Sequence, residues 1–135
     1  GIAAPDGWTV SDHVDDGAFD QLEHRNWTDP LVVTSPDGKS ALVAVRLKHL
    51  QHQPQVDPEL FWSDQVADGS TASAVTPFGV HGFRANRVTV AGDSESLEAA
   101  AVDTGDAVYL VAVRAPTAEA ADTTYQQVIQ TFDPR

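Results

Sequence analysis

The sequence predicts an α+β fold in which an antiparallel sheet of about 5–7 strands is flanked by helices. Three observations support this class. Short segments with period-two alternation fill the middle of the chain, tight-turn sequences separate them, and helical spacing recurs at 57–69 and 117–132. The 135 residues have the length of one domain, so we expect a single α+β domain over 1–135, with 1–30 as a poorly defined N-terminal segment.

The N-terminal segment gives only weak signals. Pro5-Asp6-Gly7 is typical of a turn, and Trp8–Val10 is a candidate short strand after it. Within 16–25, Phe19 and Leu22 are three residues apart, which allows one or two helical turns.

A hairpin is predicted from Leu31–Thr34 and Ala41–Leu50, joined by Ser35-Pro36-Asp37-Gly38. Pro at the second turn position and Gly at the fourth suit a type I turn. Apolar and basic residues alternate along the second strand, so one of its faces is buried and the other faces water. These positions are Val43, Val45 and Leu47 on one face and Arg46 and Lys48 on the other.

The first predicted helix follows the polar connector 51–56. Asp57 is a good N-cap, Pro58 suits the first helical position and Gly69 ends the helix. Its expected apolar side consists of Leu60, Phe61 and Val66, with Trp62 beside them.

The second half of the chain predicts further strands and a closing helix. The strand candidates are Ser73–Pro77 (weak), Phe83–Ala91, Leu97–Val102 and Ala107–Val113. The last is apolar on both faces, as expected of a central strand covered by a helix. Thr117 is the expected cap of the final helix, whose apolar stripe comprises Ala118, Ala121, Tyr125, Val128, Ile129 and Phe132.

Four stretches of the chain follow one another in a characteristic order. They are Pro5-Asp6-Gly7-Trp8; 33–38 followed by Ala41–Val45; 80–87, including Gly82 and Arg87; and Ala107–Val111 with a helix ending at Phe132. This order resembles the PsbP-like superfamily, in particular bacterial lipoprotein domains of the LpqN/LpqT and DcrB types. The resemblance implies an antiparallel sheet flanked by helices, a binding or accessory role, and no shared catalytic residues. Ser11–Pro30 departs from it, because members often lead from the Trp straight into a strand.

The acidic balance excludes several classes of partner. There are 20 acidic and 8 basic residues and a formal charge of -12. We expect no nucleic-acid binding, because phosphates require clustered Lys and Arg. The same balance argues against an anionic membrane as partner. No stretch is long enough for a transmembrane segment. The absence of Cys excludes a disulfide framework, a thiolate metal site and a Cys nucleophile.

The acidic excess itself has two explanations. Asp outnumbers Glu by 15 to 5, and Lys occurs twice. Halophilic adaptation and the codon bias of a GC-rich genome both produce this pattern, and both indicate a prokaryote.

No catalytic residue, metal site or cofactor is predicted. His49 and His52 are three apart where a strand ends, so their side chains face opposite ways, and we expect two solvated histidines. Ser35, His49 and Asp37 supply triad residue types without a nucleophile elbow. Residues 78–82 are expected to form a turn, with no Lys that would complete a phosphate loop.

The candidate binding residues are two aromatics and one histidine. Trp27 and Phe78 lie in predicted connectors with no periodic face, so each is either packed under a loop or displayed for a partner. His81, which follows Phe78 closely, is the third candidate. Asn26-Trp27-Thr28 is a sequon, which makes Asn26 a candidate glycosylation site.

These observations favour a non-enzymatic binding or accessory domain, exported and associated with the cell surface, whose protein or small-molecule partner is not identified. The chain begins at Gly1 without Met, so a signal peptide or lipid anchor before Gly1 is part of this expectation, and a cytoplasmic location stays open. One alternative is a small enzyme or small-molecule carrier with His49 or His81 in a cleft between sheet and helix. The other is a structural subunit of a surface assembly.

The carboxylate excess predicts that salt stabilises the protein. Salt screens the repulsion among like charges, so the melting temperature followed by circular dichroism should rise between low salt and molar KCl. Folding only in molar salt would indicate a halophile's protein, whereas full stability at low salt would point to a cationic partner. A melting temperature that does not change with salt would contradict the prediction that repulsion among the carboxylates lowers stability.

Overall fold

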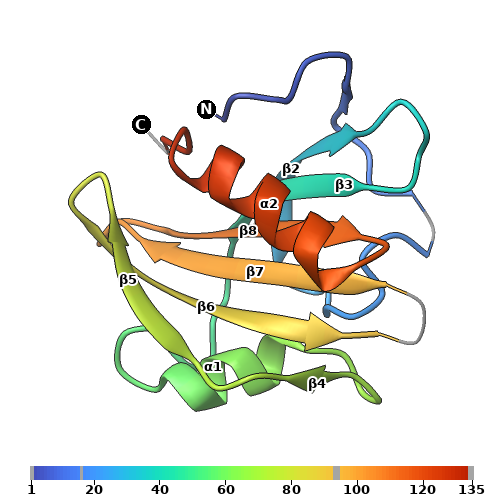
Figure 1. The fold of residues 1–135 in the computed structure, drawn as a ribbon. Helices are drawn as coiled ribbons and strands as arrows, with labels where there is room; N and C mark the ends of the chain where they lie inside the picture. Colours follow the sequence, from blue (N-terminus) through green and yellow to red (C-terminus); the bar gives the residue numbers. More distant parts are fainter. Residues whose placement is uncertain (1, 16, 93–94, 134–135) are drawn as a thin grey trace.

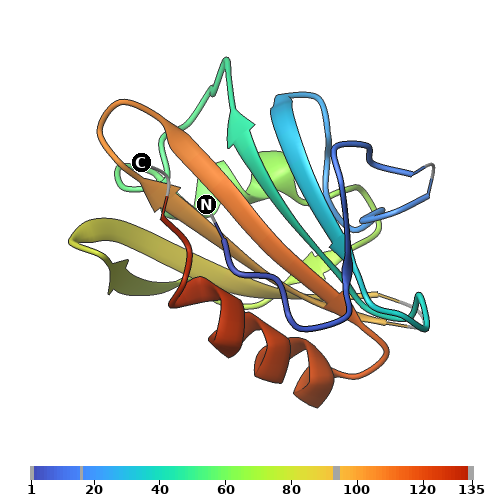
Figure 2. The same cartoon turned by 90° about the horizontal axis from the view of Figure 1, so that it is seen from above.

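The computed structural model describes residues 2–15, 17–92 and 95–133, which form one antiparallel sheet with a helix on each face (Figure 1, Figure 2). The α+β prediction is therefore confirmed, with eight strands where about 5–7 were expected. The strands are β1 (Thr9–Ser11), β2 (Trp27–Thr34), β3 (Ala41–Leu47), β4 (Thr71–Ala72), β5 (Thr76–Val80), β6 (Phe83–Ala91), β7 (Ser96–Asp103) and β8 (Val108–Ala115). The helices are α1 (Pro58–Gln65) and α2 (Ala118–Ile129).

The strands lie in the order β1-β2-β3-β8-β7-β6-β4, and β5 also pairs with β6. Strand β8 is central and pairs with β3 and β7 over their full lengths, as its two-faced apolar sequence predicts. The β2–β3 hairpin is also confirmed, because the Gly38 amide donates to the Ser35 carbonyl at 2.9 Å and closes the turn. Its second strand ends at Leu47, three residues before the predicted Leu50.

Each face of the sheet carries its own core. The face towards α1 buries Val43, Val45, Val88, Val90, Leu97 and Leu110 against Phe61 and Trp62 of the helix and Phe19 and Leu22 of the N-terminal segment. The opposite face buries Leu42, Ala85, Ala100, Val111 and Val113 against Tyr125, Val128, Ile129 and Phe132 of α2 and its C-terminal extension. The prediction for β3 is therefore right for Val43, Val45 and Leu47, which share one buried face. Its other face does not all meet water, because Leu42 is fully buried in the α2-side core.

The cap predicted for α2 is present. The backbone amide of Ala120 donates to Thr117 Oγ1 at 3.1 Å, which satisfies one of the free donors at the helix start. The helix packs on β7 and β8, where Ala100 is fully buried in the same core, whereas Ala99 and Ala101 are buried on the α1 side.

Strand β2 starts earlier than the prediction of Leu31–Thr34, because a bulge continues it backwards. Thr28 pairs with Arg46 but Leu31 pairs with Ala44, so one extra residue is inserted in β2. Asp29 adopts a left-handed backbone (φ 51°) at this insertion. The extra residue changes the face of everything before it, and Trp27 therefore points to the α1 side, where it packs against the core.

The first helix is shorter than predicted and faces differently. It ends at Gln65, four residues before Gly69, because the next residues leave the helix to pair with the N-terminal segment. The Glu23 amide donates to the Gln65 carbonyl, and the Ala67 amide donates to the Gln21 carbonyl, at 2.7 and 2.9 Å. Leu60, expected on the buried side, is 52% exposed.

Three further predictions need correction. The described residues between 17 and 25 form turns without a helix, and Asp16 lies outside the described residues. The weak strand Ser73–Pro77 is replaced by β4 and β5, which lie on either side of Ser73. The stretch 78–82 is not all turn, because Phe78–Val80 belongs to β5.

A buried amide joins α1 to the sheet. Asn86 on β6 is 3% exposed, and its Oδ1 accepts a 2.6 Å hydrogen bond from the indole Nε1 of Trp62. Its Nδ2 donates to the carbonyl of Pro54 at 2.8 Å. One side chain thus holds both the helix and the connector before it, and satisfies two buried polar groups that have no water to bond.

We expect Asn86→Ala to lower the free energy of unfolding by about 2–4 kcal/mol, because it leaves the Trp62 indole and the Pro54 carbonyl unpaired in the core. Urea unfolding measures this loss. Trp62→Phe removes one of the two bonds, so the double variant should lose less than the sum of the single ones. A stability of Asn86→Ala within about 0.5 kcal/mol of the wild type would contradict this role.

Candidate functional site

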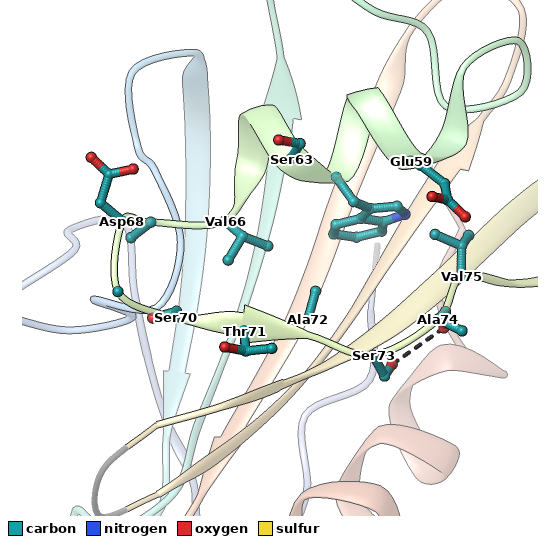
Figure 3. A pocket seen from close by; sticks show the side chains of 13 residues that line it. Glu59, Ser63, Val66, Asp68, Ser70, Thr71, Ala72, Ser73, Ala74 and Val75 are labelled. Atoms are coloured by element: carbon teal, nitrogen blue, oxygen red, sulfur yellow. Dashed lines mark hydrogen bonds between the residues drawn. The ribbon is translucent and has the colours of Figure 1, made fainter.

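A groove with a volume of about 570 Å³ lies between α1 and the following segment 66–75 (Figure 3). Four residues at helical spacing form one wall: Glu59, Trp62, Ser63 and Val66. The other wall is the segment from Ala67 to Val75, which includes β4. We call this cavity the α1 groove.

The groove exists because the chain reverses directly after α1. The Ser70 amide donates to the Ala67 carbonyl at 3.1 Å, and Gly69 takes a left-handed φ of 89° in this turn. The chain then runs back along β6. There the Ser73 amide donates to the Thr89 carbonyl at 2.8 Å, and Ser73 Oγ accepts from the Thr89 amide at 2.9 Å. Helix and returning strand are both fixed, so the space between them is preformed.

The lining combines an apolar base with polar walls. Trp62 lies at the base but is only 2% exposed, and Asn86 accepts its indole N–H, so this residue supports the groove without offering a free donor. The hydroxyl-bearing lining residues are Ser63, Ser70, Thr71 and Ser73. The charged ones are Glu59 and Asp68, and among the described lining residues none is Lys or Arg. The site therefore suits a ligand with apolar and positively charged parts.

Exposed apolar side chains lie beside the groove. Among the described residues, three large hydrophobic side chains are exposed, and two of them, Val56 at 74% and Leu60 at 52%, flank or belong to the start of α1. Leu60 belongs to α1, whereas Val56 precedes the helix, and neither residue lines the groove itself. Unburied apolar area therefore lies at the start of α1, next to the groove.

The three predicted binding residues lie outside the α1 groove. Trp27 is half-buried, stacked on the His24 ring at a centroid distance of 4.0 Å, with its indole Nε1 buried and without a partner among the described residues. Phe78 is half-buried against the α2-side core. His81 is exposed in the β5–β6 turn, where its Nε2 lies 3.0 Å from the carbonyl of Gln130. A binding role for these three stays a prediction.

His49 and His52 are not brought together as a site. His49 has a left-handed backbone (φ 56°) and lines a hollow of about 270 Å³ with Asp103 and Asp106. His52 instead contacts α1, with its Nδ1 2.8 Å from Asp64 Oδ2. The expectation of two solvated histidines is therefore wrong for His52, which is a half-buried link to the helix. The described residues hold no cluster of three or more His, Asp or Glu that could bind a metal ion.

Asn26 lies where β2 begins. Its carbonyl accepts from the Lys48 amide at 3.0 Å, and the side chain of Thr28, the third residue of the sequon, donates to the Arg46 carbonyl at 3.0 Å. Glycosylation of Asn26 stays a prediction.

The buried titratable groups lie under α2, away from the groove. Burial raises the pKa of Tyr125 to about 12, and the nearby Arg87 guanidinium opposes this rise. Burial likewise raises the pKa of Glu98, while the Thr89 hydroxyl, which donates to its carboxylate at 2.9 Å, lowers it. Packing explains both shifts, and neither group opens into the α1 groove.

Neither a family model nor a curated protein matches the chain. Neither of the described helices is long and apolar enough to cross a membrane.

The α1 groove was not predicted from the sequence. Its wall 70–74 is a run of small residues, Ser-Thr-Ala-Ser-Ala, which by itself is typical of a surface loop. The one signal in the sequence was Leu60. If Phe61 and Trp62 face the core, Leu60 must be exposed, which indicates an uncovered side of the helix. A helix this short cannot bury three successive residues on one face.

We expect His52→Ala to lower the free energy of unfolding by about 0.5–1 kcal/mol, because it releases the connector from Asp64. His13→Ala is the matched control, since the His13–Asp15 pair is 3.8 Å apart and almost fully exposed. Its effect should stay within about 0.5 kcal/mol. Equal effects of the two variants in urea unfolding would show that the His52–Asp64 contact contributes nothing.

Proposed function

We propose that this chain is a non-enzymatic binding or accessory module, exported and held at the cell surface, whose ligand occupies the α1 groove. The observation that carries the proposal is the preformed groove of about 570 Å³ beside the exposed Val56 and Leu60. Ligand sites in proteins are concave, largely preformed and commonly roughly 300–1,000 Å³ in volume.

The resemblance to the PsbP-like superfamily supports the same class of function. It implies a sheet flanked by helices and a binding or accessory role, and the α+β arrangement of this chain agrees with the first of these. Fold alone does not carry function, so the weight of the proposal rests on the groove.

A second candidate, a small enzyme or carrier, is favoured by one observation. His49 shares its hollow with Asp103 and Asp106, the residue types needed for general acid–base work. Asp103 Oδ1, however, accepts from the Gly105 amide at 2.8 Å, within the β7–β8 turn. The His49 ring makes no hydrogen bond to either carboxylate in the described part of the chain. The groove is therefore the stronger candidate.

A fragment screen followed by NMR tests the proposal on the folded chain. With the ¹⁵N-labelled protein, we expect the amide shifts caused by bound fragments to cluster at residues 59–75. Ser63→Trp should weaken this binding at least about tenfold, because the indole fills the groove from an exposed helix position. Gln127→Trp, at an exposed position of α2, is the matched control and should leave binding unchanged.

Two results would contradict the proposal. Shifts confined to 47–53 and 103–108 would favour the His49 hollow and with it the second candidate. Shifts in neither region would reject the groove as a ligand site.

A further inference from the structure

The α1 groove contains a free edge of the sheet. In the described part of the chain β4 pairs with β6 alone, at Thr71–Ala91 and Ala72–Val90. The next residue, Ser73, directs its amide to β6. Alternate residues of a strand direct their amides to opposite sides, so the peptide groups of Ala72 point away from β6. An unpaired edge of this kind is a template for another strand.

Resting on the proposed function, we infer that the occupant of the groove is an extended peptide with a Lys or Arg near each end, which adds to the sheet alongside β4. The lining segment 70–75 is six residues long. An extended peptide of the same number of residues spans roughly 20 Å.

The charges of the groove select the ends of this peptide. Figure 3 shows Asp68 at one end of the groove and Glu59 at the other, with 70–75 running between them. Both are exposed carboxylates, and the whole chain carries a formal charge of -12. A cationic group at each end of the peptide is therefore attracted, whereas a nucleic acid or an anionic lipid headgroup is repelled.

The size of the lining side chains selects the middle of the peptide. In Figure 3 the small side chain of Ala72 points from β4 towards α1, whereas the hydroxyl of Ser63 is directed away from it. Val66 and Val75 add apolar area on the two sides. Side chains of β-branched size on alternate residues of the peptide fit such a lining, because successive side chains of a strand point to opposite faces.

The test uses three synthetic peptides and the full chain. The probe is the blocked hexapeptide Lys-Val-Thr-Val-Thr-Lys. One control replaces both Lys by Glu, and the other carries N-methyl groups on alternate residues, which removes backbone donors without changing charge. The Kd of each is measured by NMR titration of the ¹⁵N-labelled protein at low and physiological salt.

The probe should shift the amides of 70–75 and 59–66 and protect the Ala72 amide from hydrogen exchange. We expect the Kd of the Glu peptide and of the N-methylated peptide to be at least about tenfold higher than that of the probe. Glu59→Gln with Asp68→Asn should weaken the probe about three- to tenfold and reduce its salt dependence. The matched control Glu119→Gln with Asp122→Asn, on exposed positions of α2, should leave the Kd unchanged.

The outcomes separate this inference from the function on which it rests. Equal binding of all three peptides, or no peptide binding while fragments occupy the groove, would overturn the inference and leave the groove as a ligand site. Failure of both peptides and fragments to shift any groove residue would overturn both. Circular dichroism of each variant confirms that it is folded.

Discussion

The position of α1 depends on the side-chain amide of Asn86. It is buried on β6 and bonds both the Trp62 indole and the Pro54 carbonyl, so it fixes the helix and the connector that leads into it. A polar group in this place costs stability unless its hydrogen bonds are made, and Asn86 bonds to both of these partners at once. The wall of the α1 groove that Trp62 contributes is therefore set by a hydrogen bond, and not by apolar contact alone.

The sheet is asymmetric in what covers it. On one face α2 lies along β7 and β8, where the buried Ala100 adds little bulk. On the other face α1 is eight residues long, and the N-terminal segment completes the cover with Phe19 and Leu22. Because α1 is short, it leaves part of this face uncovered near β4, and the groove lies there. The cavity thus follows from the length of α1, which the pairing of 65–67 with 21–23 terminates.

Local rules predicted those parts of the fold whose causes are local. The alternating apolar residues of β3, the two-faced apolar sequence of β8 and the Thr117 cap of α2 each depend on a few neighbouring residues, and each predicted its element correctly. The errors have non-local causes. The end of α1 is set by residues some forty positions earlier, and the β2 bulge by its pairing with β3. The groove also has a non-local cause, because its two walls come together only where the chain reverses against β6. The small residues of the returning segment have no periodic pattern that would predict this reversal.

The left-handed Asp29 has a consequence for how the protein tolerates sequence change. A bulge that reverses the facing of all preceding residues in its strand makes Trp27 an inward residue only as long as the extra position is kept. Deleting one residue near Pro30 would restore a regular ladder and turn the indole towards the opposite face, away from His24 and Phe19. In evolutionary terms, this short stretch should accept substitutions far more readily than insertions or deletions. Selection has to preserve the number of residues in this stretch more than their identity.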